Sequence, residues 1–208
     1  MIKIKLSYRR VFLFATLVAL FTRLVLWEGF RITSGSMFPT LHTGDLVFVS
    51  KSAFNIHVPF SNFTLVTLRA PEKGEVVIFS LPDHSLETMV KRVIATEGDR
   101  VAFQDGVLYV NDIAAEYQPL QTRPLYFEKF PWTSYPVQRT EDTMKDFGPV
   151  EVPKGHFFVL GDNRAESVDS RAWGPIPTSC LKGRVALVWL SLSSTGKILS
   201  DRVGLWVQ

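Results

Sequence analysis

One long apolar stretch near the N-terminus limits how this chain can fold. Residues 11–27 read VFLFATLVALFTRLVLW and follow a basic segment, residues 1–10. As a helix this stretch would span about 25 Å, slightly less than the ~30 Å hydrocarbon core of a bilayer. Arg23 opposes insertion, but the surrounding Leu, Val and Phe residues offset its cost, and its side chain can reach the interface near Trp27. We predict a transmembrane anchor over residues 11–29.

Two other interpretations of the apolar stretch explain less. A buried core helix does not account for the basic segment directly before it. A cleaved signal peptide needs an Ala-x-Ala-like site, and small residues follow only at 33–36. Because basic residues stay on the cytoplasmic side, residues 1–10 are predicted to form a cytoplasmic tail, and the chain after residue 29 is predicted to lie outside.

The charge of the chain argues against a nucleic-acid partner. The formal net charge is +3, and four of the basic residues belong to the N-terminal tail. A nucleic-acid-binding domain would instead gather Lys and Arg on one face. Hydrophobic residues make up 46% of the chain, which is enough to form a sizeable core.

Beyond residue 30 the sequence has the period of β-strands. Short runs rich in Val, Ile and Phe, bounded by Gly or Pro, lie at residues 45–49, 75–80, 88–96, 156–160 and 184–190. Asp105-Gly106, within residues 101–110, predicts a tight hairpin. No helical face is visible after Phe30. We predict a mainly β domain of curved antiparallel sheets, formed by residues 30–111 and 154–208.

The segment between these two parts differs from its flanks. Residues 112–153 are rich in Pro, aromatic and charged residues and show no clear period. The aromatic residues argue against disorder. We predict an inserted, loop-rich subdomain with room for one hairpin.

A candidate nucleophile lies just after the predicted anchor, in residues 34–41, SGSMFPTL. A reactive serine needs a base, a site for the developing oxyanion and a fixed backbone. Ser34 lies two residues before Ser36, with Gly35 between them, and Pro39 restricts the backbone that follows. Taken alone, the same residues are also typical of an ordinary turn.

Histidine and cysteine offer Ser36 no convincing base. His42 is near in sequence, but Ser34 occupies the position where a Gly-x-Ser-x-Gly nucleophile elbow needs glycine. Three more histidines have no acidic residue at a telling spacing: His57, His84 and His156. Cys180 is the only cysteine, so it forms no intrachain disulfide and is interpreted as a buried structural thiol.

Lysine is the alternative base, because Ser-Lys pairs recur among hydrolases. Lys91 lies in the apolar run 88–96. An ordinary lysine with a pKa of about 10.4 is neutral in roughly one molecule in 2,500 at pH 7, whereas a pKa lowered by burial to about 8 leaves nearly a tenth neutral. A polar loop at residues 161–177, GDNRAESVDSRAWGPIP, could position such a group, although it also fits a surface loop with an ion pair between Asp169 and Arg171.

Four segments together resemble the bacterial type I signal peptidases, the membrane-bound Ser-Lys proteases that remove signal peptides. They occur in the family's order after an N-terminal anchor and span most of residues 20–190. The segments are SGSMFPTL at 34–41, GDLV at 44–47 running on to Lys51, KRV at 91–93 followed by Gly98-Asp99, and the loop from Gly161 to Gly174.

The resemblance implies a role for each residue that matches a family motif. Ser36 is the expected nucleophile and Lys91 the expected general base. The Ser34 hydroxyl and the Ser36 backbone N–H are expected to stabilise the oxyanion. Ser167 is expected to hydrogen-bond the Lys91 amine and to orient it.

The resemblance also implies supporting groups and a substrate pocket. Asp169 and Arg171 are expected to form an ion pair, and Asp162 to brace the same loop. Shallow pockets for small side chains are expected to be lined by Phe30, Ile32 and Val90. No metal and no cofactor is implied. The sequence departs from many relatives at Thr33, where they have proline, and at Ala165-Glu166.

These expectations amount to an endopeptidase that cuts exported preproteins after small residues, in an Ala-x-Ala-like pattern, through an acyl-enzyme. Its partners would be preproteins and the lipid bilayer. It would be a single-pass protein of a bacterial inner membrane, with a cytoplasmic N-terminus. Three alternatives are a specialised relative that matures pilin or conjugation proteins, a self-cleaving repressor-type protease, and a membrane-tethered protein that binds signal peptides without cleaving them. The missing DNA-binding domain argues against the second, and the presence of Ser36 and Lys91 argues against the third.

Overall fold

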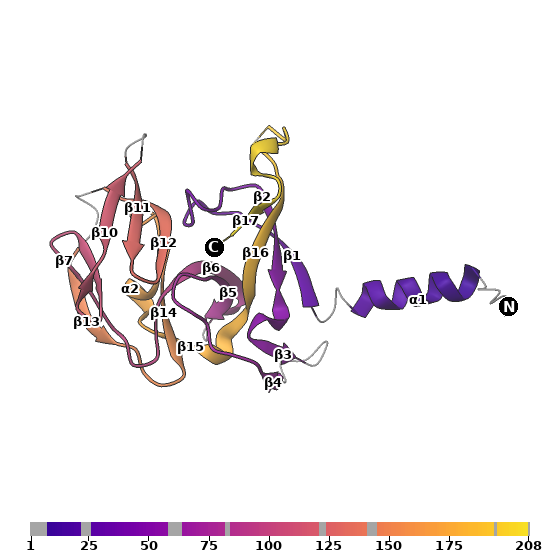
Figure 1. Ribbon diagram of the computed structural model, residues 1–208, viewed down its shortest axis with the longest axis horizontal. Coiled ribbons are helices and arrows are strands. Elements are labelled where there is room, and N and C mark those ends of the chain that lie inside the picture. Colours follow the sequence, from indigo (N-terminus) through magenta and orange to yellow (C-terminus); the bar gives the residue numbers. More distant parts are fainter. Residues whose placement is uncertain are drawn as a thin grey trace.

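The computed structural model describes residues 8–21, 26–57, 64–81, 84–120, 124–140, 145–193 and 195–207. Within these residues the protein is mainly antiparallel β, as predicted, and Figure 1 shows two neighbouring groups of strands with helix α1 (Tyr8–Phe21) apart from both. The largest sheet has the order β1-β2-β16-β5-β6-β14-β15, and β17 pairs with β16. Its strands are β1 (Trp27–Arg31), β2 (Asp45–Ser50), β5 (Val76–Leu81), β6 (His84–Thr96), β14 (His156–Leu160), β15 (Ile176–Pro177), β16 (Leu181–Ser191) and β17 (Leu205–Trp206).

The second group of strands forms two smaller sheets. One has the order β10-β11-β12 and the other β13-β7-β8-β9, while β3 (Asn55–His57) pairs with β4 (Thr64–Thr67) elsewhere. The strands are β7 (Arg100–Gln104), β8 (Val107–Val110), β9 (Ile113–Ala114), β10 (Glu116–Pro119), β11 (Leu125–Phe130), β12 (Thr133–Gln138) and β13 (Phe147–Glu151). Short helical turns complete the described chain: η2 (Lys51–Ala53), α2 (Ser170–Trp173), η4 (Thr178–Cys180) and η5 (Ser200–Arg202).

Three apolar clusters hold these sheets together. Two lie on the large sheet, around Val47 and Ile78 in one and around Phe79 and Phe157 in the other. The third is shared by the smaller sheets and by β6 and β14, with Phe103, Leu108, Phe130, Tyr135 and Phe158 among its members. Strands β6 and β14 therefore connect the two groups, and the residues that follow them lie where the groups meet.

The strands predicted from periodicity are confirmed with small shifts. The run at 156–160 matches β14, whereas β6 begins four residues before the predicted 88 and β16 three residues before the predicted 184. The predicted hairpin joins β7 to β8, and Asp105 and Gly106 take the positive φ values of 48° and 76° that its turn requires. The prediction that no helix follows Phe30 misses the single turn α2.

The prediction of a loop-rich segment at 112–153 is wrong in its loop content. This segment contains β9 to β13, including the expected hairpin between β11 and β12. Alternation was hidden because Pro119 lies at the end of β10 and Pro136 lies within β12, where a missing N–H weakens the usual strand signal. The segment also shares its core with residues 94–110 and 152–160. The domain boundaries remain a prediction.

The predicted anchor at 11–29 is only partly described, since residues 22–25 lie outside the described residues. The anchor prediction required residues 27–29 to be helical, and they are not. They belong to β1, because pairing with β2 places Phe30 against the core around Val47. Helix α1 has 14 residues, and none of the described helices is both long enough and apolar enough to cross a membrane.

Candidate active site

Ser36 lies in the loop between β1 and β2, and buried apolar residues hold this loop against the large sheet. Met37 and Leu41 are almost fully buried and belong to the cluster around Val47. The loop closes on itself through backbone bonds, with the Leu41 N–H donating to the Met37 carbonyl at 2.9 Å and the Ile32 N–H to the Asp45 carbonyl at 2.8 Å. The side chain of Ser36 is left half-buried at the surface of the core.

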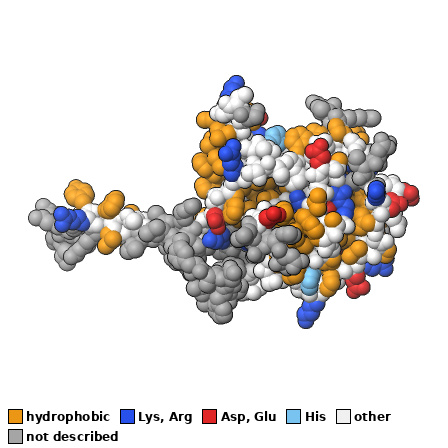
Figure 2. Space-filling model, turned by 180° about the vertical axis from the view of Figure 1, so that it is seen from behind, with side chains coloured by type: hydrophobic (Ala, Val, Ile, Leu, Met, Phe, Trp, Pro, Cys, Tyr) orange, Lys and Arg blue, Asp and Glu red, His pale blue; other side chains and the backbone are white. Residues whose placement is uncertain are grey.

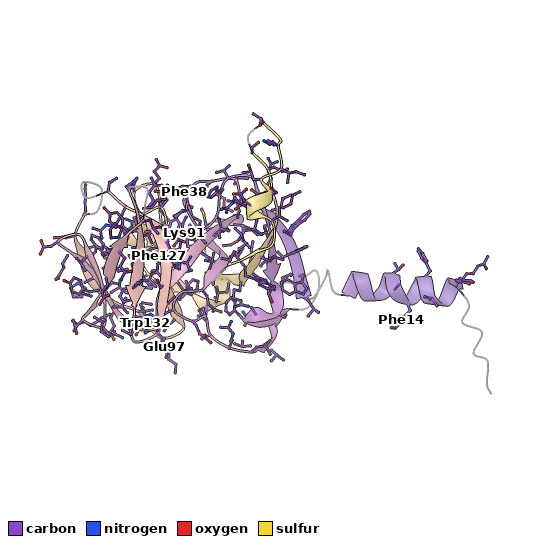
Figure 3. The ribbon with its side chains drawn as sticks, turned by 45° about the horizontal axis from the view of Figure 1, so that its top comes forward. Phe14, Phe38, Lys91, Glu97, Phe127 and Trp132 are labelled. Atoms are coloured by element: carbon purple, nitrogen blue, oxygen red, sulfur yellow. The ribbon has the colours of Figure 1, made fainter. Side chains whose placement is uncertain are left out.

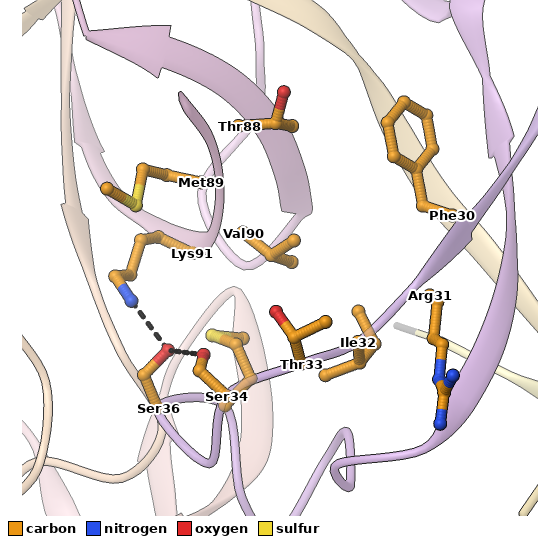
Figure 4. Close-up of a pocket in the computed structure, with 11 residues that line it drawn as sticks. Phe30, Arg31, Ile32, Thr33, Ser34, Ser36, Thr88, Met89, Val90 and Lys91 are labelled. Carbon is orange, nitrogen blue, oxygen red and sulfur yellow. Dashed lines mark hydrogen bonds between the residues drawn. The ribbon is translucent and has the colours of Figure 1, made fainter. Parts of the chain in front are cut away.

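Lys91 reaches Ser36 from the middle of β6. Its Nζ donates a hydrogen bond to Ser36 Oγ at 2.7 Å, and the residue is only 4% exposed (Figures 3 and 4). Burial lowers the pKa of Lys91 to about 8, although the negative charges of Asp169 and Asp162 oppose this shift. Lys91 thus meets the condition of burial under which the sequence analysis considered it as a base, and among the described residues its amine has no carboxylate partner within salt-bridge distance.

The second serine of the motif also faces the Ser36 hydroxyl. Ser34 Oγ lies 3.2 Å from Ser36 Oγ, and either hydroxyl can be the donor (Figure 4). The backbone N–H of Ser36 donates to no group in the described part of the chain. A hydroxyl and a free N–H therefore lie beside the Ser36 hydroxyl, which is the donor set that an oxyanion needs.

The loop after β14 packs on the opposite side of Ser36. The Asn163 N–H donates to the Ser36 carbonyl at 3.1 Å, and a Cβ on Gly161 would lie 2.5 Å from that carbonyl oxygen. Only glycine therefore fits at position 161. The Gly161 N–H in turn donates to the Asp169 carboxylate at 3.0 Å, and the expected ion pair with Arg171 is present at 2.8 Å.

The hydrogen bond predicted between Ser167 and Lys91 is not made. The Ser167 hydroxyl is buried and makes no hydrogen bond of regular geometry within the described residues, although it lies close enough to the Asp169 carboxyl to help lower its pKa. It packs against Gly161, so that a Cβ there would collide with it. The Lys91 amine is instead turned to Ser36. A motif match places Ser167 near the nucleophile loop but does not fix which hydroxyl the amine selects.

A shallow cavity opens beside these residues, between β1, β6 and the nucleophile loop (Figure 4). The three residues predicted to line it, Phe30, Ile32 and Val90, do so. The rest of the lining comes from Ser36, Lys91, Ser34 and Thr33, and from four residues that the sequence analysis did not assign to the site: Arg31, Met37, Thr88 and Met89.

Comparison with known proteins agrees with this arrangement. The family model for signal peptidases, peptidase S26, matches residues 5–190. The chain belongs to this family. It is 31% identical to a signal peptidase I of Pseudomonas fluorescens over 89% of this chain and 72% of that protein, and 32% identical to one of Pseudomonas aeruginosa with the same coverage. It is also 35% identical to thylakoidal processing peptidase 1 of Arabidopsis thaliana, over 82% of this chain and 44% of that protein. As a member of the signal peptidase family, the chain is a serine endopeptidase.

In this member of the signal peptidase family, Asp162 braces the site through partners that sequence reasoning missed. Arg92 donates to the Asp162 carboxylate from Nε and Nη2, both at 2.8 Å, and to the Gly74 carbonyl from Nη1. Thr40 donates to the same carboxylate at 2.5 Å. This network ties β6, the nucleophile loop and the loop after β14 together. The sequence feature that could have indicated this network is the pair of adjacent cationic residues, Lys91 and Arg92, inside an apolar run.

The described histidine side chains take no part in the site. His42 stacks on Phe38 with ring centroids 4.9 Å apart, and burial lowers its pKa. His156 bonds the Lys154 carbonyl at the surface. Neither forms a hydrogen bond with Ser36, and the sequence context had likewise given no reason to expect a histidine base.

Proposed function

We propose that this signal peptidase removes N-terminal signal peptides from exported preproteins through a dyad of Ser36 and Lys91. The observation that carries the proposal is the 2.7 Å contact between Lys91 Nζ and Ser36 Oγ, made by an amine that is almost fully buried. A lysine pKa of about 8 leaves close to a tenth of the molecules with a neutral amine at pH 7. That fraction is enough for a general base.

In the proposed mechanism, Lys91 carries the proton at each step. Neutral Lys91 takes the hydroxyl proton while Ser36 Oγ attacks the scissile carbonyl carbon. The Ser36 N–H and the Ser34 hydroxyl donate to the resulting oxyanion. As the tetrahedral intermediate collapses, the protonated Lys91 gives its proton to the leaving amine, and the mature protein departs. Lys91 then deprotonates a water that hydrolyses the ester with Ser36 and releases the signal peptide.

The remaining predicted residues act by holding these groups. The Asp169–Arg171 pair and the bond from Gly161 to Asp169 fix the loop that carries Ser167. The unpartnered Ser167 hydroxyl is available to the Lys91 amine once Ser36 is acylated. Asp162 keeps the nucleophile loop next to β6 through Thr40 and Arg92.

Specificity for small residues follows from the cavity. Phe30, Ile32 and Val90 line this shallow cavity, and we expect their bulk to exclude large side chains. Two such positions before the cut would select the Ala-x-Ala-like pattern of signal peptides.

The lipid bilayer is the proposed second partner. Helix α1 exposes apolar side chains, including Phe12 and Phe14, which is 70% exposed (Figures 2 and 3). We propose that residues 11–26 anchor the chain in a bacterial inner membrane, with residues 1–10 in the cytoplasm. The nearest strands carry exposed aromatic residues: Trp27, Phe48, Trp189 and Trp206. Tryptophan favours the membrane–water interface, which suits a sheet that lies at its surface.

The decisive test is incubation of the purified full chain with a synthetic peptide that contains an Ala-x-Ala site, followed by mass spectrometry. Cleavage directly after the second Ala is expected, and Ser36→Ala should abolish it. Binding without any product would instead favour the non-cleaving protein. A panel of preproteins then separates a general enzyme from one that is restricted to pilin or conjugation proteins.

A further inference from the structure

The segment 112–153 contributes a buried carboxylate to the loop that packs on Ser36. Glu128 lies on β11 and Arg164 lies in the loop after β14, and both side chains are fully inaccessible to solvent. The guanidinium binds both carboxylate oxygens, with Nη1 donating to Oε2 at 2.5 Å and Nη2 to Oε1 at 2.7 Å. Such bidentate pairing fixes the orientation of both side chains.

Two tyrosines of the same segment complete the coordination of Glu128. Tyr117 on β10 donates to Oε2 at 2.8 Å, and Tyr135 on β12 donates to Oε1 at 2.7 Å. All three strands of the β10-β11-β12 sheet therefore take part: β11 carries the carboxylate, and β10 and β12 each supply a donor. Four donors satisfy its acceptor sites, so the charge is held in a single geometry.

A short path of backbone bonds leads from this cluster to the nucleophile. Arg164 Nε donates to the Gly161 carbonyl at 3.1 Å, and the Arg164 N–H donates to the Gln138 carbonyl of β12 at 2.9 Å. The next residue toward the site, Asn163, donates its N–H to the Ser36 carbonyl and its side-chain amide to the Gly35 carbonyl at 3.2 Å. The Arg164 backbone thus meets β12, and the adjacent Asn163 meets the nucleophile loop.

We propose that Glu128 is a positioning residue for the Ser36–Lys91 reaction, and that bracing the loop 161–164 is a task of segment 112–153. Through Arg164, Glu128 sets where Asn163 holds the carbonyl of Ser36, and so where Oγ lies relative to Lys91 Nζ. Displacements of about 1 Å can cost about a hundredfold in rate. The catalytic part of this inference rests on the proposed function, and the bracing itself does not.

The test compares Glu128→Gln with the wild type in two measurements at a temperature where both are folded. The first is hydrogen exchange of the Asn163 amide, which does not depend on cleavage. Exchange through local opening is expected to be at least tenfold faster in Glu128→Gln, while the amides in β5, which exchange by global unfolding, report the loss of overall stability separately. The second is peptide cleavage, where kcat is expected to fall about 10- to 100-fold with KM within threefold.

Two further variants separate positioning from stability. Tyr135→Phe keeps the ion pair and removes one donor, so it serves if Glu128→Gln does not fold, and a smaller loss of kcat and faster Asn163 exchange are expected. Tyr126→Phe is the matched control, because the Tyr126 hydroxyl has no hydrogen-bond partner among the described residues. Unchanged Asn163 exchange in the folded variants overturns the brace, and faster exchange with unchanged kcat overturns the catalytic role. If the wild type cleaves no peptide, the proposed function fails, while the exchange measurement still decides the brace.

Discussion

Lys91 and Arg164 are both buried cationic residues, and their surroundings treat the charge in opposite ways. Arg164 meets a carboxylate that binds both of its terminal nitrogens. Burial lowers the pKa of Arg164, but the charge and hydrogen bonds of Glu128, together with Tyr135 and Tyr117, outweigh burial and raise it. Within the described residues, the Lys91 amine hydrogen-bonds only the Ser36 hydroxyl, and burial lowers its pKa to about 8. Burial is common to both, so the partner decides whether a buried cation is a structural link or a reactive base.

The largest expected effect comes from substitutions that remove the reactive base Lys91 or its partner Ser36. Lys91→Ala and Ser36→Ala should each reduce kcat/KM for a signal peptide by about 10⁴-fold or more, because proton transfer and attack fail together. Lys91→Arg should be equally inactive, since a guanidinium stays protonated. Lys154→Ala, an exposed lysine, is the control and should retain activity. Wild-type rates in either dyad variant would remove the residue from the mechanism.

The structural side should respond in stability. Glu128→Gln leaves the Arg164 charge buried without its carboxylate, and the free energy of unfolding should fall by about 3–5 kcal/mol in denaturant titrations. The exposed pair of Arg100 and Asp112 provides the contrast. Asp112→Asn should change stability by less than about 0.5 kcal/mol. Equal costs for the two variants would mean that burial of the ion pair has no energetic consequence.

Removing the charge of Lys91 should stabilise the fold, whereas removing the charge of Glu128 should destabilise it. The pKa of Lys91 in the folded state is about 8, below the 10.5 of a free lysine side chain, so folding at pH 7 works against a protonated amine. Lys91→Met should therefore raise the free energy of unfolding at pH 7 by about 2–3 kcal/mol. This advantage is full below pH 8 and should disappear as the pH rises to 10.5. A less stable Lys91→Met protein at pH 7 would contradict the assignment.

The smallest expected effect is the dependence of the cleavage rate on pH, which tests whether Lys91 is the reactive member of the two buried cations. Because the neutral amine is the base, kcat/KM should rise about tenfold per pH unit between pH 6 and 7.5 and level off above pH 8. Peptide cleavage measured across this range gives the apparent pKa directly. A flat profile from pH 6 to 9 would exclude Lys91 as the titrating base.

Sequence patterns predicted the elements of the site better than its contacts. The strand that carries Lys91 and the turn at Asp105-Gly106 follow from local periodicity and from the φ preferences of a tight turn. The Ser36–Lys91 contact joins residues that are 55 positions apart, and the resemblance to a family, not the periodicity, paired them. The bond expected from Ser167 to Lys91 is not made in this structure, because a motif carries residue types but not the rotamer that an amine adopts.

The Glu128–Arg164 pair was missed for a related reason. A carboxylate within β11 and an arginine in a polar loop each fit a solvated surface. Both side chains become buried only because the β10-β11-β12 sheet packs against the loop after β14. Charge pairing across 36 positions leaves no local signal, because neither spacing nor alternation encodes which distant strand arrives.

The adjacency of Lys91 and Arg92 on β6 has a consequence for how this gene can change. Successive side chains on a strand point to opposite faces, so one residue addresses Ser36 and the next addresses Asp162. A single-codon deletion upstream in β6 would move Arg92 into the place of Lys91 and Val93 into the place of Arg92, so the serine would face a guanidinium and the carboxylate would lose its partner. A two-codon deletion would restore the alternation of faces, but it would put Val93 in the place of Lys91. Deletions upstream in this strand should therefore be lost under selection, whether single or paired.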